Sequence, residues 1–332
     1  MPETLTPART PAAVIGLGLM GRSISACLLA AGHRVVGVET SASQRRVAAP
    51  RIGSLLRQMH REGLLARPVS GVMERFQVTG DYEEAAESQL VIEAVFEDPE
   101  SKRALFKRVE SMVSARTLIG CNTSAIPISS LQEGARHPQR ILGIHWAEPA
   151  HVTRFLEIIC GRQTSAAAAR RVAALARYWG KEPTLVRRDI RGFITNRCFY
   201  ALLREAMYLV ENGYATVADV DRSLRNDLGY WITFAGPFRF LDLTGIPAYD
   251  AVARDLFPEL ATTQEVPQLL ARLARSGARG TANQRGFYRY TPQQARAWEK
   301  LFHDFSYEVR ALAMRYPEDI GDRPARGRKK RP

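Results

Sequence analysis

The sequence predicts an α/β Rossmann-type chain, in which a doubly wound, mostly parallel sheet is followed by an all-α C-terminal domain. Short β-rich runs alternate with helical stretches in the first half, as they do in doubly wound sheets. A glycine-rich turn joins the first strand to the first helix. Beyond Gly192 the apolar residues recur at helical spacing. A chain of 332 residues is also long for one core, so two domains are expected.

The strands of the predicted sheet are short apolar runs rich in β-branched residues. They are expected at 13–15, 34–38, 90–95, 117–121, 140–144, 155–159 and 184–186. Helices are expected between them at 22–31, 99–113 and 164–179, and Pro99 suits a first helical position. In the second half, helices are expected at 193–211, 217–224, 240–256, 266–275 and 292–314. This order places all the strands before residue 187.

The domain limits follow from these elements and from composition. We expect a disordered leader at 1–11, which lacks the apolar core of a secretory signal. The sheet domain is then predicted at 12–187, the helical domain at 188–320, and a disordered basic tail at 321–332. The net charge is +13, and six of the basic residues lie in the tail between Arg323 and Arg331. We attribute this part of the charge to a solvated tail and expect no nucleic-acid partner. The remaining excess is mild and suits a protein whose ligands carry phosphates or carboxylates.

The remaining bulk properties are those of an ordinary globular protein. Hydrophobic residues make up 45% of the chain and charged residues 24%, and no apolar run has the length of a membrane span. The four cysteines form no Cys-x-x-Cys pair, and the six histidines form no His-x-x-x-His pair. We therefore expect no metal site, free and mostly buried thiols, and a reducing cytoplasmic location.

The turn after the first strand has the pattern of a dinucleotide-binding loop. Its sequence contains Gly16, Gly18, Leu19, Met20 and Gly21. The first glycine allows the tight turn, the second lets the backbone approach a pyrophosphate, and the third permits close packing of helix on strand. The following helix offers unpaired N–H groups and the positive end of its dipole to the phosphates.

An acidic residue ends the second strand, where it selects between the two nicotinamide cofactors. Glu39 lies 18 residues after the last glycine of the loop. A carboxylate there accepts hydrogen bonds from ribose hydroxyls and repels a 2′-phosphate. The sequence therefore predicts NAD as the cofactor.

Several further segments resemble motifs of the 3-hydroxyacyl-CoA dehydrogenase family. Leu90–Asp98 is similar to the family's "LVIEAVxED" strand and turn, and Asn122–Ser124 to "SNTSS", with Cys121 and Ala125 in place of the flanking serines. Gly143–Pro149 is similar to "GxHFFNP", Phe155–Ile159 to "LVEVI" and Gly192–Arg197 to "GFxxNR". Gly236–Pro237 and Gly286–Tyr290 match later family signatures. The resemblance covers about residues 12–295.

The resemblance implies a catalytic set and an NAD-dependent oxidation of a hydroxyl group. His145 would be the general base, Glu157 would orient its imidazole, and Ser124 and Asn196 would hold the reacting region. Glu97 and Asn122 would lie near the nicotinamide. The chemistry suits these residue types, because histidine titrates near neutrality and a neighbouring carboxylate helps it accept a proton. Glu157 is also unusual as a residue, since it interrupts an apolar run and a buried carboxylate needs a partner.

Departures from the acyl-CoA pattern leave the substrate open. Glu148 stands where those enzymes have asparagine. The segment Leu228–Pro237 is more similar to a CoA-independent branch that includes lambda-crystallin (an L-gulonate dehydrogenase), carnitine dehydrogenases and a pyridoxine-degradation dehydrogenase. Trp146, Tyr230 and Trp231 are candidate pocket residues beside Glu148, with core packing as their other interpretation.

The sequence is therefore compatible with three functions. The first is an L-3-hydroxyacyl-CoA dehydrogenase of fatty acid metabolism. The second is an oxidation of a CoA-free hydroxy acid or a hydroxylated or aldehyde ring compound. The third is a non-catalytic NAD-binding structural protein, against which the four catalytic residues argue. The resemblance also implies a helical domain like that of 6-phosphogluconate dehydrogenase and a homodimer, since the helices carry many apolar residues that one copy would struggle to bury.

Overall fold

The computed structural model describes residues 5–316 and divides the chain into two compact units. The first unit extends to Arg197 and the second begins at Cys198. This division lies ten residues after the boundary predicted at 187/188. Hydrogen bonds from Ser129 to Asp189, and from the backbone of Ile194 and Thr195 to Glu157, tie this segment to the first unit. The predicted basic tail lies outside the described residues.

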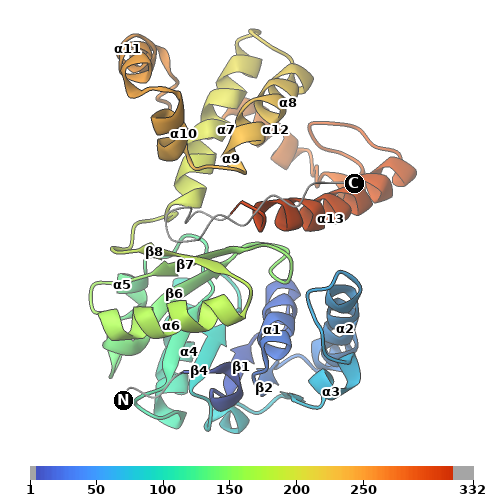
Figure 1. Ribbon diagram of the computed structural model, residues 1–332, viewed down its shortest axis with the longest axis vertical. Helices are drawn as coiled ribbons and strands as arrows, with labels where there is room; N and C mark the ends of the chain where they lie inside the picture. The colour runs from blue at the N-terminus through green and yellow to red at the C-terminus, as the bar shows by residue number, and fades with distance from the viewer. Residues whose placement is uncertain (1–4, 317–332) are drawn as a thin grey trace, which may run out of the picture. The chain divides into compact units, whose positions relative to one another are not determined.

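The first unit is built on one eight-stranded sheet with the order β3-β2-β1-β4-β5-β6-β7-β8. All neighbouring strands are parallel except β6 and β7, which are antiparallel. The strands are β1 (Ala12–Ile15), β2 (Val35–Val38), β3 (Phe76–Thr79), β4 (Leu90–Glu93), β5 (Leu118–Cys121), β6 (Ile141–Trp146), β7 (Phe155–Ile159) and β8 (Glu182–Val186). The predicted Rossmann-type sheet is confirmed (Figure 1).

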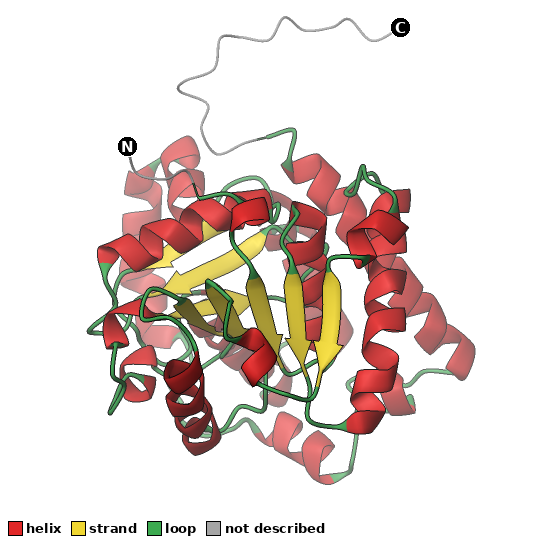
Figure 2. Ribbon diagram, turned by 90° about the horizontal axis from the view of Figure 1, so that it is seen from below, coloured by secondary structure: helices red, strands yellow, loops and turns green. Residues whose placement is uncertain are grey.

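Helices cover both faces of this sheet (Figure 2). They are α1 (Leu19–Ala31), α2 (Ala42–Arg61), α3 (Val69–Met73), α4 (Pro99–Met112), α5 (Ile128–Leu131) and α6 (Ala166–Tyr178). Apolar residues of α1, α2, α3 and α6 pack on one face of the sheet, and those of α4 and α5 pack on the other. The strands therefore read as nearly continuous apolar runs, because both of their faces are buried.

The described part of the second unit consists of helices, loops and two isolated β-bridges, Gly280 with Arg285 and Arg285 with Arg289. Its helices are α7 (Thr195–Glu211), which starts in the first unit, α8 (Val217–Asn226), α9 (Leu228–Ile232), α10 (Pro237–Thr244), α11 (Ile246–Leu256), α12 (Gln268–Arg275) and α13 (Pro292–Ala313). The single helix predicted at 240–256 is wrong. The chain breaks at Gly245, which has a φ of 105°, and Pro247 then occupies a first-turn position of α11.

Two other predictions for the first unit need correction. Strand β3 was not predicted, because its run Phe-Gln-Val-Thr is short and only partly apolar, and it pairs at the edge of the sheet beside β2. The leader was predicted to be disordered to residue 11, but residues 7–9 form a 3-10 turn and Thr10 is buried. Of the four free thiols, Cys27 and Cys121 are buried as predicted, while Cys160 is half-buried and Cys198 is exposed.

A buried histidine joins the start of the chain to the core beneath α6. His33 is fully buried, with its Nδ1 at 2.7 Å from the carbonyl oxygen of Thr10. Its Nε2 accepts a hydrogen bond of 2.9 Å from Nε1 of Trp179. An imidazole that accepts at Nε2 and donates from Nδ1 is neutral. Burial accordingly lowers the pKa of His33 to about 4.

This histidine should make the fold sensitive to acid. Between pH 6.5 and about 4 the unfolded chain binds a proton at His33 and the folded chain does not, so stability falls as the pH falls through this window. The difference corresponds to about 3 kcal/mol. We expect His33→Gln, whose amide can make both hydrogen bonds without titrating, to flatten the free energy of unfolding between pH 4 and 6.5. Equal pH slopes for the two proteins in urea titrations would contradict this assignment.

Candidate functional site

The sequence-predicted residues of the first unit gather at the carboxyl ends of its parallel strands. The order of the sheet reverses between β1 and β4, which diverge in opposite directions along it. In open α/β sheets, ligands bind outside the strand ends at such a switch point. The glycine loop follows β1, and Glu93 ends β4 beside it, in register with Ile15.

Each glycine of the loop meets a different steric demand. Gly16 has a φ of 90°, and a Cβ there would lie 2.7 Å from the carbonyl oxygen of Ala94. A Cβ on Gly21 would lie 1.8 Å from the carbonyl oxygen of Gly16, so this position is closed by the packing of helix on turn. A Cβ on Gly18 would meet nothing within 4 Å, which leaves the loop open where a pyrophosphate approaches.

The start of α1 and Glu39 complete a site that fits NAD. Gly18 precedes α1 and provides no side-chain cap, so the N–H groups of the first turn, at Leu19 and Met20, face the open side of the loop. Glu39 accepts hydrogen bonds of 2.9 Å from the backbone N–H groups of Leu17 and Ser41. These contacts fix the carboxylate at the end of β2, where a ribose would meet it.

The reversal of β7 places His145 and Glu157 directly opposite each other. The two residues pair across the antiparallel β6–β7 ladder, and directly opposed residues project from the same face. Nδ1 of His145 lies 2.9 Å from Oε2 of Glu157. The His145 side chain is 9% exposed and that of Glu157 is 1% exposed. The ring therefore donates from Nδ1 and keeps the lone pair of Nε2 for another proton.

Glu157 also receives the first N–H groups of α7. Its Oε1 accepts hydrogen bonds from the backbone of Ile194 (3.2 Å) and Thr195 (3.1 Å). Burial alone would raise the pKa of Glu157, but the hydrogen bonds from His145 and these two N–H groups outweigh it and hold the pKa below its usual range. The carboxylate is thus charged, and it stabilises both the imidazole and the start of the helix.

Two aromatic rings flank the imidazole of His145. The ring of Phe155 meets it edge-on at a centroid distance of 5.4 Å, and Phe193 lies at 5.7 Å. Phe193 is buried and has a φ of 51°, a left-handed conformation that is unfavourable for a bulky side chain. The conformation turns the chain so that the next two N–H groups point at Glu157.

Ser124 is held through both of its backbone groups. Its N–H donates to Oε1 of Glu97 at 2.9 Å, and its carbonyl oxygen accepts from Nδ2 of Asn196 at 2.8 Å. The same Glu97 oxygen accepts from the hydroxyl of Thr123 and the N–H of Ala125. The exposed hydroxyl of Ser124 is left free of these contacts. Asn122, on the same turn, accepts from the N–H of Trp146 at 3.1 Å and so ties the turn to β6.

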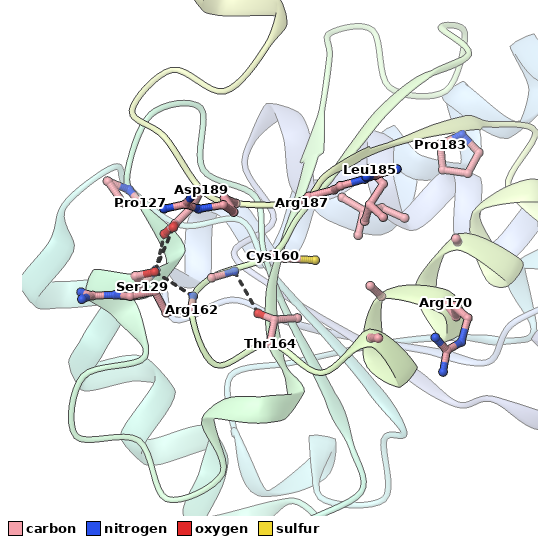
Figure 3. Close-up of a pocket in the computed structure, with 16 residues that line it drawn as sticks. Pro127, Ser129, Cys160, Arg162, Thr164, Arg170, Pro183, Leu185, Arg187 and Asp189 are labelled. Atoms are coloured by element: carbon pink, nitrogen blue, oxygen red, sulfur yellow. Dashed lines mark hydrogen bonds between the residues drawn. The ribbon is translucent and has the colours of Figure 1, made fainter.

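The segment that leads to Asn196 is anchored beside a separate cavity. This cavity of about 800 Å³ lies along α6 and β8, and its lining contains none of the four predicted catalytic residues (Figure 3). At one end, Asp189 accepts hydrogen bonds from the N–H (2.5 Å) and hydroxyl (2.9 Å) of Ser129. Asp189 thereby fixes the chain shortly before it enters α7.

The candidate pocket residues have different surroundings. Trp146 is 2% exposed and stacks on Trp179 at a centroid distance of 5.3 Å, which favours core packing, the other interpretation given for it. Successive residues of a strand point to opposite faces, so His145 and Trp146 cannot both face the site. Glu148 is exposed in the loop after β6, and partial desolvation of its carboxyl raises its pKa. Tyr230 and Trp231 belong to the second unit, where Trp231 stacks on Phe240.

Sequence reasoning missed several residues that shape the site. Phe193 lies within the segment Gly192–Arg197 that resembles a family motif, but its position beside His145 depends on its backbone conformation. Phe155 was predicted only as part of a strand, although its position two residues before Glu157 places both side chains on one face. Glu93 and Lys102, a buried ion pair of 2.6 Å behind the Ser124 turn, were not singled out. A lysine inside a helix gives no signal that it will be buried.

Replacement of Glu157 by glutamine should test how the pair works. The amide of glutamine can donate to Nδ1 and thus favour the tautomer in which Nε2 carries the proton, which cannot act as a base. We expect kcat to fall by roughly 10²- to 10⁴-fold while the NAD dissociation constant stays within a few-fold. Steady-state NADH formation and NAD titration measure these quantities. Unchanged kcat would exclude the assigned role.

Comparisons with known proteins agree with this geometry. The family model for the NAD-binding domain of 3-hydroxyacyl-CoA dehydrogenase matches residues 11–190, and the model for its C-terminal domain matches residues 192–290. A 5-formyl-3-hydroxy-2-methylpyridine 4-carboxylate 5-dehydrogenase of Mesorhizobium japonicum is 32% identical over 86% of this chain and 92% of the relative. A 3-hydroxybutyryl-CoA dehydrogenase of Mycobacterium tuberculosis is 31% identical over 83% of this chain and 97% of the relative.

Solved structures give the same two kinds of relative. A crystal structure of a 5-formyl-3-hydroxy-2-methylpyridine 4-carboxylic acid 5-dehydrogenase, described as an NAD⁺-dependent dismutase, superposes with a TM-score of 0.85 at 28% identity and covers 92% of this chain and 98% of its own. The (S)-3-hydroxybutyryl-CoA dehydrogenase of Ralstonia eutropha gives 0.71 at 26% identity and covers 85% and 99%. The predicted NAD-dependent dehydrogenase is confirmed, and the chain belongs to the 3-hydroxyacyl-CoA dehydrogenase family.

Proposed function

We propose that this chain oxidises a hydroxyl group of a compact, CoA-free substrate, with His145 as the base. The hydrogen bond of 2.9 Å between Nδ1 of His145 and Glu157 carries the proposal. It leaves Nε2 as the proton acceptor, and the charged Glu157 stabilises the imidazolium that forms. NAD, when bound, supplies the acceptor for the hydride that leaves the same carbon.

The other residues position the substrate oxygen. The Ser124 hydroxyl is free to donate to this oxygen because the backbone of Ser124 is held by Glu97 and Asn196. Burial of His145 between Phe155 and Phe193 restricts the motion of the ring and keeps water from its sides. Fixed geometry of this kind lowers the entropic part of the barrier, since the base and the hydroxyl need not search for each other.

Glu148 favours the CoA-free class of substrate. Acyl-CoA members of the family have asparagine at this position, and its amide can donate a hydrogen bond. The charged carboxylate of Glu148 can only accept. It suits a substrate with a donor group, such as a second hydroxyl or a protonated ring nitrogen, better than a thioester carbonyl, which only accepts. The relative with a TM-score of 0.85 is named for a pyridine carboxylate without CoA.

The chemistry extends to an aldehyde substrate. An aldehyde adds water to give a hydrate, which carries a hydroxyl group and a C–H bond on one carbon. His145 can take the hydroxyl proton of the hydrate as the hydride leaves, and the product is a carboxylic acid. The same four residues therefore support oxidation of either an alcohol or a hydrated aldehyde. A 3-hydroxyacyl-CoA substrate, and with it a role in fatty acid metabolism, is the second candidate, favoured by the 3-hydroxybutyryl-CoA dehydrogenase relatives.

A substrate panel separates the two classes. We expect NADH formation with free hydroxy acids or with hydroxymethyl- and formyl-pyridine carboxylates, and little with 3-hydroxybutyryl-CoA. Glu148→Asn should lower kcat/KM for the preferred CoA-free compound by about 10- to 100-fold, because the substrate donor exchanges a charged acceptor for a weaker neutral one. Turnover of 3-hydroxybutyryl-CoA alone would support the second candidate and exclude the first.

His145→Gln is the control for chemistry as opposed to binding. It should abolish turnover of every substrate on the panel while NAD still binds, because the glutamine has no base of suitable pKa. A variant that retained activity would exclude His145 as the base. A protein that bound NAD but turned over no substrate would instead agree with the non-catalytic alternative.

We also infer that the second unit pairs with a second copy of the chain. Of its described residues, few are buried: Met207, Val220, Ala235, Ala295 and Tyr307. One face of α13 carries apolar side chains at helical spacing that are more than half exposed: Trp298, Leu301, Phe302 and Phe305. A unit with so small a core is not stable alone, and burial of each such side chain contributes about 1.5–3 kcal/mol. A symmetric dimer is the simplest cover.

Light scattering after size exclusion tests this pairing. We expect twice the chain mass for the wild-type protein and a shift toward the monomer for the Phe302→Glu/Phe305→Glu variant. Glu299→Gln, on the same helix, should leave the mass unchanged. A wild-type monomer at all concentrations would contradict the proposal.

A cytoplasmic location is proposed from the free thiols. Within the described residues, no helix combines the length and apolarity needed to span a membrane.

A further inference from the structure

A cluster of buried ionisable groups lies behind the Ser124 turn. Glu93, Lys102 and Cys121 are each 0% exposed. Oε1 of Glu93 accepts from Nζ of Lys102 at 2.6 Å and from the N–H of Val95 at 2.6 Å. Its Oε2 accepts from Sγ of Cys121 at 2.9 Å. The register of β4 and β5 brings Glu93 and Cys121 side by side, while Lys102 reaches them from α4.

Filling a core with ionisable groups costs more free energy than filling it with apolar side chains. A buried ion pair loses the hydration of both charges, and well-packed apolar residues of similar volume are often as stable or more so. Every lone pair and proton that the pair presents must then find a partner. Glu93 satisfies this condition with three donors. A carboxylate held by three donors has little freedom to move, and this one lies at the end of the sheet where the candidate site is built.

The network continues from the core to the turn that carries Ser124. Nζ of Lys102 also lies 3.4 Å from Oε2 of Glu97. The other oxygen of Glu97 accepts hydrogen bonds from Thr123, Ser124 and Ala125. The side chain of Glu97 is 42% exposed, so in the absence of a buried anchor water would compete for its oxygens. Lys102, itself held by Glu93, supplies that anchor from the dry side.

We propose that Glu93 and Lys102 are positioning residues, which fix the Ser124 turn by holding the Glu97 carboxylate between a buried ammonium and three donors of the turn. The proposal rests on the function proposed above for Ser124. Glu93 sets the place of the lysine, the lysine sets the orientation of Glu97, and Glu97 holds the N–H of Ser124. Neither Glu93 nor Lys102 needs to touch the substrate, because each acts through the next residue of this chain of contacts.

Cys121 completes the network in its neutral form. Burial, and then the neighbouring Glu93 carboxylate, raise the pKa of the Cys121 thiol well above its usual range, so the thiol keeps its proton and donates it to Glu93. The 3-hydroxyacyl-CoA dehydrogenases have a serine at this position of the motif, which donates in the same way.

The double variant Glu93→Gln/Lys102→Met separates positioning from simple stability. Lys102→Met alone leaves a buried carboxylate without its cation and should lower the thermal midpoint strongly. The double variant removes both charges, so we expect its midpoint to return most of the way to the wild-type value. Its kcat should nevertheless stay about 10- to 100-fold low, because Glu97 has lost its anchor and the turn is misplaced. Recovery of kcat together with the midpoint would overturn the proposal.

Hydrogen exchange gives a readout that does not depend on turnover. The N–H groups of Ser124 and Ala125 donate to Glu97, so their exchange should be at least about tenfold faster in the double variant. Exchange in β5, whose N–H groups pair with β4, should not change. Lys107→Met, which removes an exposed lysine from the same helix, is the matched control and should alter neither exchange nor kcat. Unchanged exchange at 124–125 in the double variant would refute the network.

Ser124→Ala distinguishes failure of this proposal from failure of the proposed function. If the network acts through Ser124, the loss caused by the double variant should largely disappear in a Ser124→Ala background, because coupled residues are not additive. An equal loss in both backgrounds would show that the network acts elsewhere and would overturn the proposal, while the dehydrogenase function would stand. A protein that turned over no substrate would refute the proposed function, and the exchange data would still decide the network.

Discussion

The pairing of His145 with Glu157 is the constraint on which the rest of the site depends. It exists because β7 runs antiparallel to β6, so that residues 12 positions apart in the chain become directly opposed neighbours on one face. The carboxylate has two oxygens, and each has a separate task. One oxygen fixes the tautomer of the imidazole, and the other accepts the first N–H groups of α7. A single buried side chain thus sets the tautomer of His145 and holds the backbone just before Asn196.

The hydrogen bonds that Glu157 accepts from the backbone require an unfavourable backbone conformation nearby. The N–H groups of Ile194 and Thr195 point at Glu157 only because Phe193 adopts a left-handed conformation that its side chain disfavours. The strain is offset by burial of the phenyl ring against His145 and by two charge-assisted hydrogen bonds. The Ser124 turn is organised on the same principle, since Glu97 and Asn196 hold its backbone and leave the hydroxyl uncommitted. In both places backbone groups make the hydrogen bonds that hold the residues in position. Nε2 of His145 and the hydroxyl of Ser124 take no part in these contacts.

The sequence predicted the parts of this arrangement that depend on local pattern. Apolar runs located seven of the eight strands, and the glycine loop and Glu157 stood out because their residue types are unusual where they occur. Features that depend on register or on a backbone angle were not predicted. The sequence left Trp146 open between the pocket and the core, and strand alternation, which turns it away from the face of His145, favours the core. Glu93 and Cys121 are 28 positions apart and become neighbours only through the pairing of β4 with β5. The break at Gly245 was missed because apolar periodicity continues through it.

The proposed catalytic residues and the residue proposed to select the substrate lie in structurally different places, the former mainly on strands and the latter in a loop. The groups proposed to handle the proton lie on β6, on β7 and in a turn held by buried contacts, where a change of one residue disturbs several partners. Glu148 lies in a loop and has fewer constraints, so an acid can replace an amide there without altering the base. Substitution at such a position changes which hydrogen-bonding groups a substrate must present and leaves the oxidation itself intact. On the function proposed here, relatives named for a CoA ester and for a pyridine carboxylate can share one arrangement of His145 and Glu157 and differ in the side chain at the position of Glu148.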